Sequence, residues 1–286
     1  MLKPRPHPLS PLLRHPFLKD SRFIGLMSLL LPGGSLLAWS HFVETRWLEI
    51  TRYPVTLPGL SQPLRLLHLS DLHFTRADAW HQQMVDALQH LEVDVAVITG
   101  DVTMPGHDLD AVKRLLRALP HPPLGLFLVP GNWEYWSGFN RETLRALGQD
   151  TGITVLIDES VQLPGGLTLV GIDSELGGHP EINKVYASLP KTGPTLVLSH
   201  CPATFAQLDR APAQLVLSGH THGGQLRMPL KGAVWLPTGS SRYDQGWFQG
   251  QHARLFVSRG FGTSMARLRF LCRPEATLLT LSGGAS

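Results

Sequence analysis

The sequence predicts an α/β fold in which two sheets pack together and helices cover their outer sides. From about residue 64, short apolar runs alternate with stretches of helical periodicity. The second half of the chain is richer in apolar runs of strand length. The 28 glycines and 23 prolines fall largely between these runs and mark tight connections instead of disorder. Strand–helix alternation followed by strand-rich sequence is typical of an α/β sandwich.

The first half supplies three strand–helix units. Each expected strand is an apolar run, and each expected helix has apolar positions spaced for one face. Asp108 stands where a helix N-cap is needed, since its side chain can accept from the first backbone N–H groups. The expected strands are 64–69, 93–98 and 124–129, and the expected helices are 78–91, 108–119 and 141–147.

The second half supplies more strands and only short helices. Strands are expected at 154–157, 167–172, 195–198, 214–217, 233–236, 255–257 and 276–281, and helices at 182–189 and 203–208.

The N-terminal part has a different character. Residues 1–22 are basic, and residues 23–39 form an uncharged apolar run, FIGLMSLLLPGGSLLAW, at the lower limit for crossing a bilayer. We therefore expect a membrane-anchor or signal segment at 23–40, a linker with an edge strand at 41–63, and a folded domain at 64–282. Because Pro32 interrupts the run, three interpretations stay open: a single-pass anchor, a segment dipping into one leaflet, or a cleaved signal.

Charge and cysteine content narrow the partners. The net charge of +3 is partly concentrated near the N-terminus, which favours a membrane surface over nucleic acid. No nucleic-acid-binding motif is present, so no nucleic-acid partner is expected. Two cysteines cannot build a disulfide framework, and Cys201 is expected to be a small buried hydrophobe. The oligomeric state stays open.

The strongest polar signals lie just past the ends of expected strands, where open α/β sheets place their ligand sites. His220 and His222 are two residues apart after a glycine, so both side chains can reach one small volume. Two carboxylates, one amide and four imidazoles suit Mn, Fe or Zn, and seven ligands fit two ions that share a bridging carboxylate. The set is Asp71, His73, Asp101, Asn132, His200, His220 and His222.

Five blocks in this order, Asp71-x-His73, Gly100-Asp101, Gly131-Asn132, His200 and Gly219-His220-x-His222, resemble the calcineurin-like metallophosphoesterases over about residues 64–282. The resemblance implies a four-layer αββα sandwich of two mixed sheets and a dinuclear phosphoesterase. It implies two divalent ions, with Mn²⁺ preferred and Fe or Zn as alternatives. It assigns Asp71, His73 and His222 to one ion and Asn132, His200 and His220 to the other, with Asp101 bridging. Asp101 and Asn132 are thus also expected to be catalytic.

One position departs from the family pattern. The family usually has Gly-Asn-His followed by Glu or Asp, and here Trp133 replaces the histidine that stabilises the transition state or protonates the leaving oxygen. An indole N–H can donate a hydrogen bond but cannot deliver a proton near neutral pH. Either the site is degenerate and Trp133 packs, or the leaving group departs unaided. The presence of every metal ligand favours the second interpretation.

Further residues receive secondary assignments. Trp133, Tyr135 and Trp136 are expected either to wall a pocket for a base or acyl chain or to pack within a loop. Arg259 is expected to clamp a phosphate, with a surface salt bridge as the alternative. Five histidines outside the blocks receive no role: His68, His81, His90, His107 and His121.

The segments Gly223-Gly224-Gln225 and Ser258-Arg259-Gly260, and an expected hairpin near 229–237, resemble a bacterial membrane-associated branch of the family. Some members of that branch cleave UDP-diacylglucosamine in lipid A synthesis. The expected function is hydrolysis of a phosphodiester or pyrophosphate bond in a lipid precursor such as UDP-2,3-diacylglucosamine, at the bacterial inner membrane. The membrane face stays open, since UDP-linked substrates are cytoplasmic whereas the N-terminal charge bias suggests export. The alternatives are a general phosphodiesterase for other envelope substrates and a catalytically degenerate metal-binding scaffold.

Overall fold

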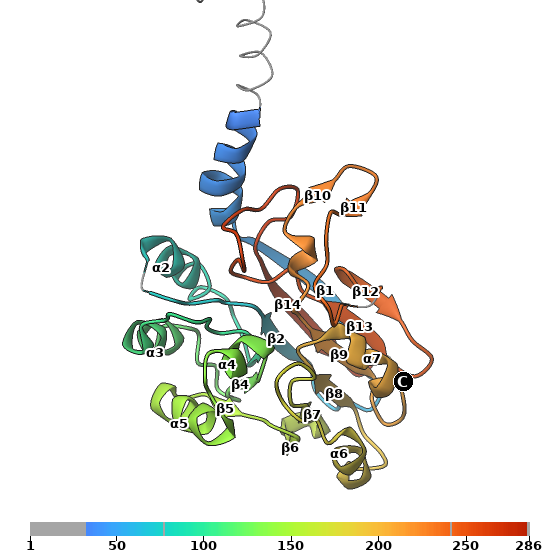
Figure 1. Cartoon of the computed structure of the whole chain (residues 1–286). Coiled ribbons are helices and arrows are strands. Elements are labelled where there is room, and N and C mark those ends of the chain that lie inside the picture. The colour runs from blue at the N-terminus through green and yellow to red at the C-terminus, as the bar shows by residue number, and fades with distance from the viewer. Residues whose placement is uncertain (1–32, 77, 241, 285–286) are drawn as a thin grey trace, which may run out of the picture.

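The computed structural model describes residues 33–76, 78–240 and 242–284. Two six-stranded sheets pack face to face, with helices on their outer sides (Figure 1). The strand order of the first sheet is β1-β14-β2-β3-β4-β5, in which β2 to β5 are parallel and β14 runs antiparallel to β2. Its strands are β1 (Glu49–Thr56), β2 (Leu64–Leu69), β3 (Val95–Thr99), β4 (Leu126–Val129), β5 (Thr154–Val155) and β14 (Glu275–Ser282).

The second sheet has the order β12-β13-β9-β8-β7-β6. Its four central strands are parallel, and both edge strands run antiparallel to their neighbours. Its strands are β6 (Glu159–Gln162), β7 (Thr168–Gly171), β8 (Thr195–Leu198), β9 (Leu215–Ser218), β12 (Gly246–Gln249) and β13 (Arg254–Val257). A separate two-stranded hairpin, β10 (Arg227–Met228) and β11 (Gly232–Ala233), projects beyond this sheet.

The helices form the two outer layers. On the first sheet lie α2 (Ala79–Asp86), α3 (Leu109–Arg117) and α5 (Arg141–Thr151), and on the second lie α6 (Ile182–Ser188) and α7 (Phe205–Leu208) (Figure 1). The short helix α4 (Asn132–Trp136) follows β4 directly. In α3, the Asp108 side chain accepts from the backbone N–H of Ala111 at 3.1 Å, which confirms the expected N-cap.

Both faces of the central strands are buried, which explains their apolar runs. In β2, Leu66 belongs to the core between the sheets, whereas Leu67 packs in the core under the helices. In β3, Val97 likewise belongs to the core between the sheets and Ile98 to the core under the helices. A third core lies between the second sheet and α6 and α7. The expected four-layer αββα sandwich of two mixed sheets is therefore confirmed.

The differences from prediction lie at edges and ends. Edge strands β6 and β12 were not predicted, because their partly exposed residues lack a continuous apolar run. The five-residue helix α4 is too short to show periodicity. The expected helix 78–91 ends at Asp86, and the expected strand 233–236 is only Gly232–Ala233.

The N-terminal boundary also shifts. Residues 1–32, with the basic segment and most of the apolar run, lie outside the described residues; residues 33–46 are helical. Ser40, which the sequence assigned to the apolar segment, is buried and donates from Oγ to the carbonyl of Arg269 at 2.7 Å. The Glu44 carboxylate accepts from the backbone N–H of Cys272 at 2.6 Å. By packing, the domain therefore begins at about residue 40, since residues 33–39 are exposed. None of the helices in the described residues combines the length and the hydropathy that a bilayer-spanning segment requires.

Candidate metal centre

The seven predicted ligand residues meet at one end of the sandwich. Asp71 and His73 follow β2, Asp101 follows β3, and Asn132 begins α4 directly after β4. From the second sheet, His200 follows β8, and His220 and His222 follow β9. All seven side chains are buried. The structure thus brings every predicted ligand to the carboxyl ends of the parallel strands.

The backbone turns sharply at these positions. Five of the seven residues have φ between 49° and 70°, a left-handed conformation that non-glycine residues rarely adopt. Such conformations cluster at functional sites, where the surrounding fold holds them. The neighbouring glycines are required for packing: a Cβ at Gly131 would overlap the Asp101 carboxylate, and a Cβ at Gly219 would overlap the Ser70 hydroxyl. This close approach explains why glycine precedes Asn132 and His220.

The side chains divide into two groups. In one, Nε2 of His73 lies 3.0 Å from Nε2 of His222, which lies 3.4 Å from Oδ1 of Asp71. In the other, Nε2 of His200 lies 3.0 Å from Oδ1 of Asn132 and 3.1 Å from Nδ1 of His220.

Asp101 stands between the two groups. Its Oδ2 lies 3.1 Å from Nε2 of His200 and 3.9 Å from Nε2 of His73. This arrangement has the same division, with the same shared carboxylate, as the one that the family resemblance implied.

Two of the imidazoles are oriented by backbone carbonyls. Nδ1 of His200 donates to the carbonyl of Thr99 at 2.7 Å, and Nε2 of His220 donates to the carbonyl of Thr238 at 2.6 Å. Because a carbonyl only accepts, each bond places a proton on that nitrogen and leaves the other nitrogen, Nε2 of His200 or Nδ1 of His220, to face the centre. These two nitrogens lie 3.1 Å apart.

Burial sets the protonation of the centre. It lowers the pKa of His73 and of His220 to about 4, and it raises the pKa of Asp71 to about 7. Burial also opposes protonation of His200, but the Asp101 carboxylate outweighs it and raises the pKa of His200 to about 9. Burial also lowers the pKa of His222, so three of the four imidazoles are neutral at pH 7 and able to act as nitrogen ligands.

This set of residues fits divalent metal ions. Two groups made up of predicted ligands place their ligand atoms within 4.8 Å of one another: Asp71 with His73 and His222, and Asp71 with Asp101 and His200. A divalent ion would take the place of the proton that the raised pKa puts on His200 and would bind the nitrogen lone pair. The ligand atoms are nitrogen and oxygen, which suits Mn, Fe or Zn.

Glu134 supports the centre although the sequence did not predict it as a site residue. Its buried carboxylate accepts from four backbone N–H groups, those of Gly131, Asp101, Val102 and Thr103, at 2.6–3.3 Å. These bonds tie the loop that carries Asp101 to the start of α4. The available signal was the acidic residue that the family pattern places two positions after Asn132.

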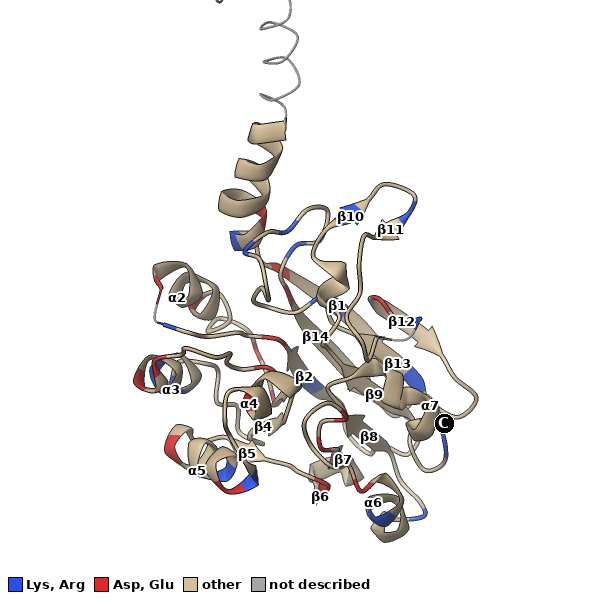
Figure 2. Cartoon of the chain, viewed as in Figure 1, with Lys and Arg blue, Asp and Glu red and all other residues tan. Residues whose placement is uncertain are grey.

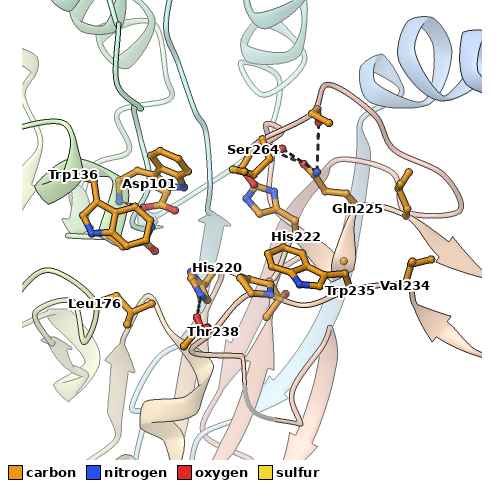
Figure 3. A pocket seen from close by; sticks show the side chains of 18 residues that line it. Asp101, Trp136, Leu176, His220, His222, Gln225, Val234, Trp235, Thr238 and Ser264 are labelled. Atoms are coloured by element: carbon orange, nitrogen blue, oxygen red, sulfur yellow. Dashed lines mark hydrogen bonds between the residues drawn. The ribbon is translucent and has the colours of Figure 1, made fainter.

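A cavity of about 540 Å³ opens in front of the centre. Asp101, Asn132, His220 and His222 line its inner end, and the rest is mainly apolar. Figure 3 shows Trp136 and Leu176 on one side and Val234 and Trp235 on the other.

The three aromatic residues of α4 do not share one role. Trp133 and Trp136 line the cavity with their rings edge to face, 5.2 Å between centroids. The Trp133 backbone N–H also donates to Oδ1 of Asp101 at 2.8 Å. Tyr135 instead donates its hydroxyl to the buried Asp173 at 2.5 Å, so it does not wall the cavity.

The guanidinium of Arg259 is held by two carboxylates outside the predicted ligand set, so its expected role as a phosphate clamp requires correction. Its guanidinium pairs with Glu49 at 2.8 Å and with Glu275 at 3.1 Å. These two carboxylates come from the neighbouring strands β1 and β14, and they form ion pairs with the guanidinium in place of a phosphate. Arg259 lines a different cavity, so the structure favours the salt bridge that the sequence left as the alternative.

Comparison with known proteins identifies the family. The chain is 28% identical to an uncharacterized metallophosphoesterase of Bacillus subtilis, YkuE, over 94% of this chain and 97% of the relative. It is 29% identical to the phosphodiesterase YaeI of Escherichia coli, over 91% and 98%. It is 25% identical to the UDP-2,3-diacylglucosamine pyrophosphatase LpxG of Chlamydia trachomatis, over 84% and 91%. The profile of the calcineurin-like phosphoesterase family matches residues 64–224, more than half of the chain, and with the site described above it makes this protein a member of that family.

Proposed function

We propose that this metal-dependent phosphoesterase hydrolyses a phosphodiester or pyrophosphate bond in a membrane-lipid precursor such as UDP-2,3-diacylglucosamine. The observation that carries the proposal is the cavity, which joins the metal centre to a mainly apolar chamber. The chamber is lined by four side chains that could not pair with a second charged group of a substrate: Leu226, Val234, Trp235 and Met265. A substrate with a phosphate at the metal centre and an acyl chain against these side chains would match both ends of the cavity.

The chain's own residues have defined parts in this reaction. Asp71, His73 and His222 would hold one ion, and Asn132, His200 and His220 the other, with Asp101 between. When bound, two divalent ions, preferably manganese, with iron or zinc as alternatives, supply Lewis-acid catalysis of phosphoryl transfer to water. The Trp133 backbone N–H and Glu134 fix the position of Asp101. Trp133 and Trp136 line the cavity beside Asp101 and Asn132.

A separate proton donor is missing from the described lining. The ionisable side chains that line the cavity are Asp101, His220 and His222, all of them candidate ligands. Protonation of the leaving group by one of them would compete with metal binding. This supports a substrate whose leaving group is already a good one, such as the phosphate monoester released from a pyrophosphate.

The proposal includes attachment to the bacterial inner membrane through the apolar segment 23–40, with the membrane face left open. A phosphodiesterase that acts on other envelope substrates is the second candidate, favoured by the printed activity of the Escherichia coli relative. A degenerate scaffold is disfavoured, because the structure assembles all seven ligand residues.

The test uses the metal-loaded full chain and three probes: UDP-2,3-diacylglucosamine, bis(p-nitrophenyl) phosphate and p-nitrophenyl phosphate. We expect the lipid pyrophosphate to have the highest kcat/KM, and Asp101→Asn to abolish turnover of all three. Hydrolysis of the soluble diester without hydrolysis of the lipid would favour the second candidate. If none of the three is hydrolysed, the scaffold becomes the better interpretation.

A further inference from the structure

Large exposed apolar side chains are concentrated at one end of the described structure. Thirteen of the fifteen belong either to residues 36–47 or to the segment 226–271, and only Leu109 and Trp136 lie elsewhere. We call seven of them the apolar rim: Leu226, Met228, Leu230, Val234, Trp235, Met265 and Leu271. Figure 1 shows the helical residues 33–46 and the β10–β11 hairpin projecting from the same end.

Hydrogen bonds join the segments at this end. Nδ1 of His41 lies 2.7 Å from the carbonyl of Arg267, which connects the N-terminal helix to the loop that carries Met265. The Gln225 side-chain amide, at the base of the hairpin, donates to the carbonyl of Ser264 at 3.0 Å (Figure 3). The helix, the loop and the hairpin therefore form one continuous face.

Folding does not explain the residues at the tips. Leu230, at the turn of the hairpin, is fully exposed, and its φ is 67°. Met265 is 82% exposed, and its φ is 58°. Glycine or asparagine is the favoured residue in such a conformation, and a long apolar side chain there stabilises neither the turn nor a core. Apolar groups gathered in this way mark an interaction surface.

The rim is continuous with the candidate active site. Leu226, Val234, Trp235 and Met265 belong to the rim and also line the cavity whose inner end holds His220 and His222. The rim therefore surrounds an apolar path from the surface to the metal centre.

Charge and chain direction indicate what covers the rim. Lys231 is exposed beside Leu230 and makes no ion pair among the described residues. Figure 2 shows basic residues on the β10–β11 hairpin. Arg46 and Arg267, close to each other at the foot of the helix, likewise have no ion pair in the described ranges. In the sequence, the helical residues 33–46 are preceded by residues 23–32, FIGLMSLLLP, so an uncharged apolar stretch leads into this face. Apolar tips among basic side chains, next to such a segment, match an anionic lipid bilayer better than a protein partner.

We propose that the apolar rim inserts into the interfacial layer of an anionic membrane, so that a lipid substrate passes from the leaflet into the cavity without crossing water. The passage rests on the proposed function, whereas the docking of the rim does not.

The docking test uses the full chain in vesicles of phosphatidylethanolamine and phosphatidylglycerol. A polarity-sensitive fluorophore is attached at Leu230→Cys, and at Leu109→Cys as the matched control, because Leu109 is an exposed leucine outside the rim. Cys201 and Cys272 are buried, which limits labelling to the introduced thiol. We expect a blue shift, and quenching by spin-labelled lipid, at 230 only. Equal water exposure at both sites would overturn the proposal, as would a shift at 230 that needs a second protein copy instead of lipid.

The passage test compares Leu230→Glu with Leu109→Glu, neither of which lines the cavity. Leu230→Glu should reduce turnover of the lipid pyrophosphate in vesicles about tenfold, while turnover of soluble bis(p-nitrophenyl) phosphate stays unchanged. Leu109→Glu should change neither. An unchanged vesicle rate in Leu230→Glu would refute passage through the rim. If the wild type hydrolyses no probe at all, the proposed function fails, and the fluorescence result at 230 still decides the docking.

Discussion

The replacement of Glu134 by glutamine tests whether this buried carboxylate holds the metal centre together. Oε2 of Glu134 accepts from the backbone N–H groups of Gly131 and Asp101, and Oε1 accepts from those of Val102 and Thr103. Glutamine keeps one oxygen but places an NH₂ group where the other stood. Two buried N–H donors would then face a donor.

The magnitude follows from that geometry. Each buried N–H that loses its acceptor costs about 1–3 kcal/mol, so Glu134→Gln should lower the free energy of unfolding by about 2–6 kcal/mol. A domain of ordinary stability, about 5–15 kcal/mol, would remain folded through most of this range. Because Asp101 is one of the four donors, metal affinity should also fall, by about 10–100-fold as for other residues that support metal ligands.

The assay measures denaturant unfolding of the metal-free protein and metal binding by calorimetry. Asp209→Asn is the matched control, since the Asp209 carboxylate also accepts from backbone N–H groups, those of Gln251, His252 and Ala253. Asp209 lies outside the metal centre and is less buried, so this control should lose about 1 kcal/mol and bind metal normally. The reasoning would be refuted if Glu134→Gln lost no more stability than the control and bound both ions with wild-type affinity.

Four further predictions concern the reaction, acid stability and the N-terminal boundary. Asp101→Asn should reduce the metal content and abolish turnover while the fold is retained; full activity, or activity after exhaustive chelation, would exclude a dinuclear centre. Trp133→His should speed the cleavage of poor leaving groups most and flatten the plot of kcat/KM against leaving-group pKa, each pKa unit being worth up to about tenfold. Equal slopes in the two proteins would point to another proton donor. Burial lowers the pKa of His68 to about 3, so its contribution to stability is complete above the unfolded pKa of about 6.5 and is lost as pH falls towards 3. Between pH 7 and 4.5, the free energy of unfolding should therefore fall by about 2–3 kcal/mol less in His68→Gln than in the wild type. Parallel plots of unfolding free energy against pH for the two proteins would contradict this. Deletion of residues 2–32 should leave the unfolding midpoint nearly unchanged, whereas deletion of 2–47 should lower it, because Ser40 and Glu44 then leave their partners unpaired; equal midpoints would refute the shifted boundary.

The sequence alone located the centre of this protein. Each ligand residue follows the end of an apolar run, and parallel strands of one sheet end at a common edge, so Asp71, Asp101 and Asn132 could be placed together from the sequence. The layering was equally predictable, because strands buried on both faces read as continuous apolar runs.

The tertiary structure decided what depends on pairing between distant segments. Arg259 satisfied every local criterion for a phosphate clamp, yet Glu49, 210 residues away, reaches it because β1 pairs with β14. Edge strands β6 and β12 are set by their neighbours, since their own residues carry little burial signal. Ser40 belongs to the domain because of its bond to Arg269, and Glu134 gains its role from backbone donors on another loop. Burial and periodicity are local properties that a sequence records, whereas the partner of a polar group depends on which segments the fold brings within 3 Å of one another.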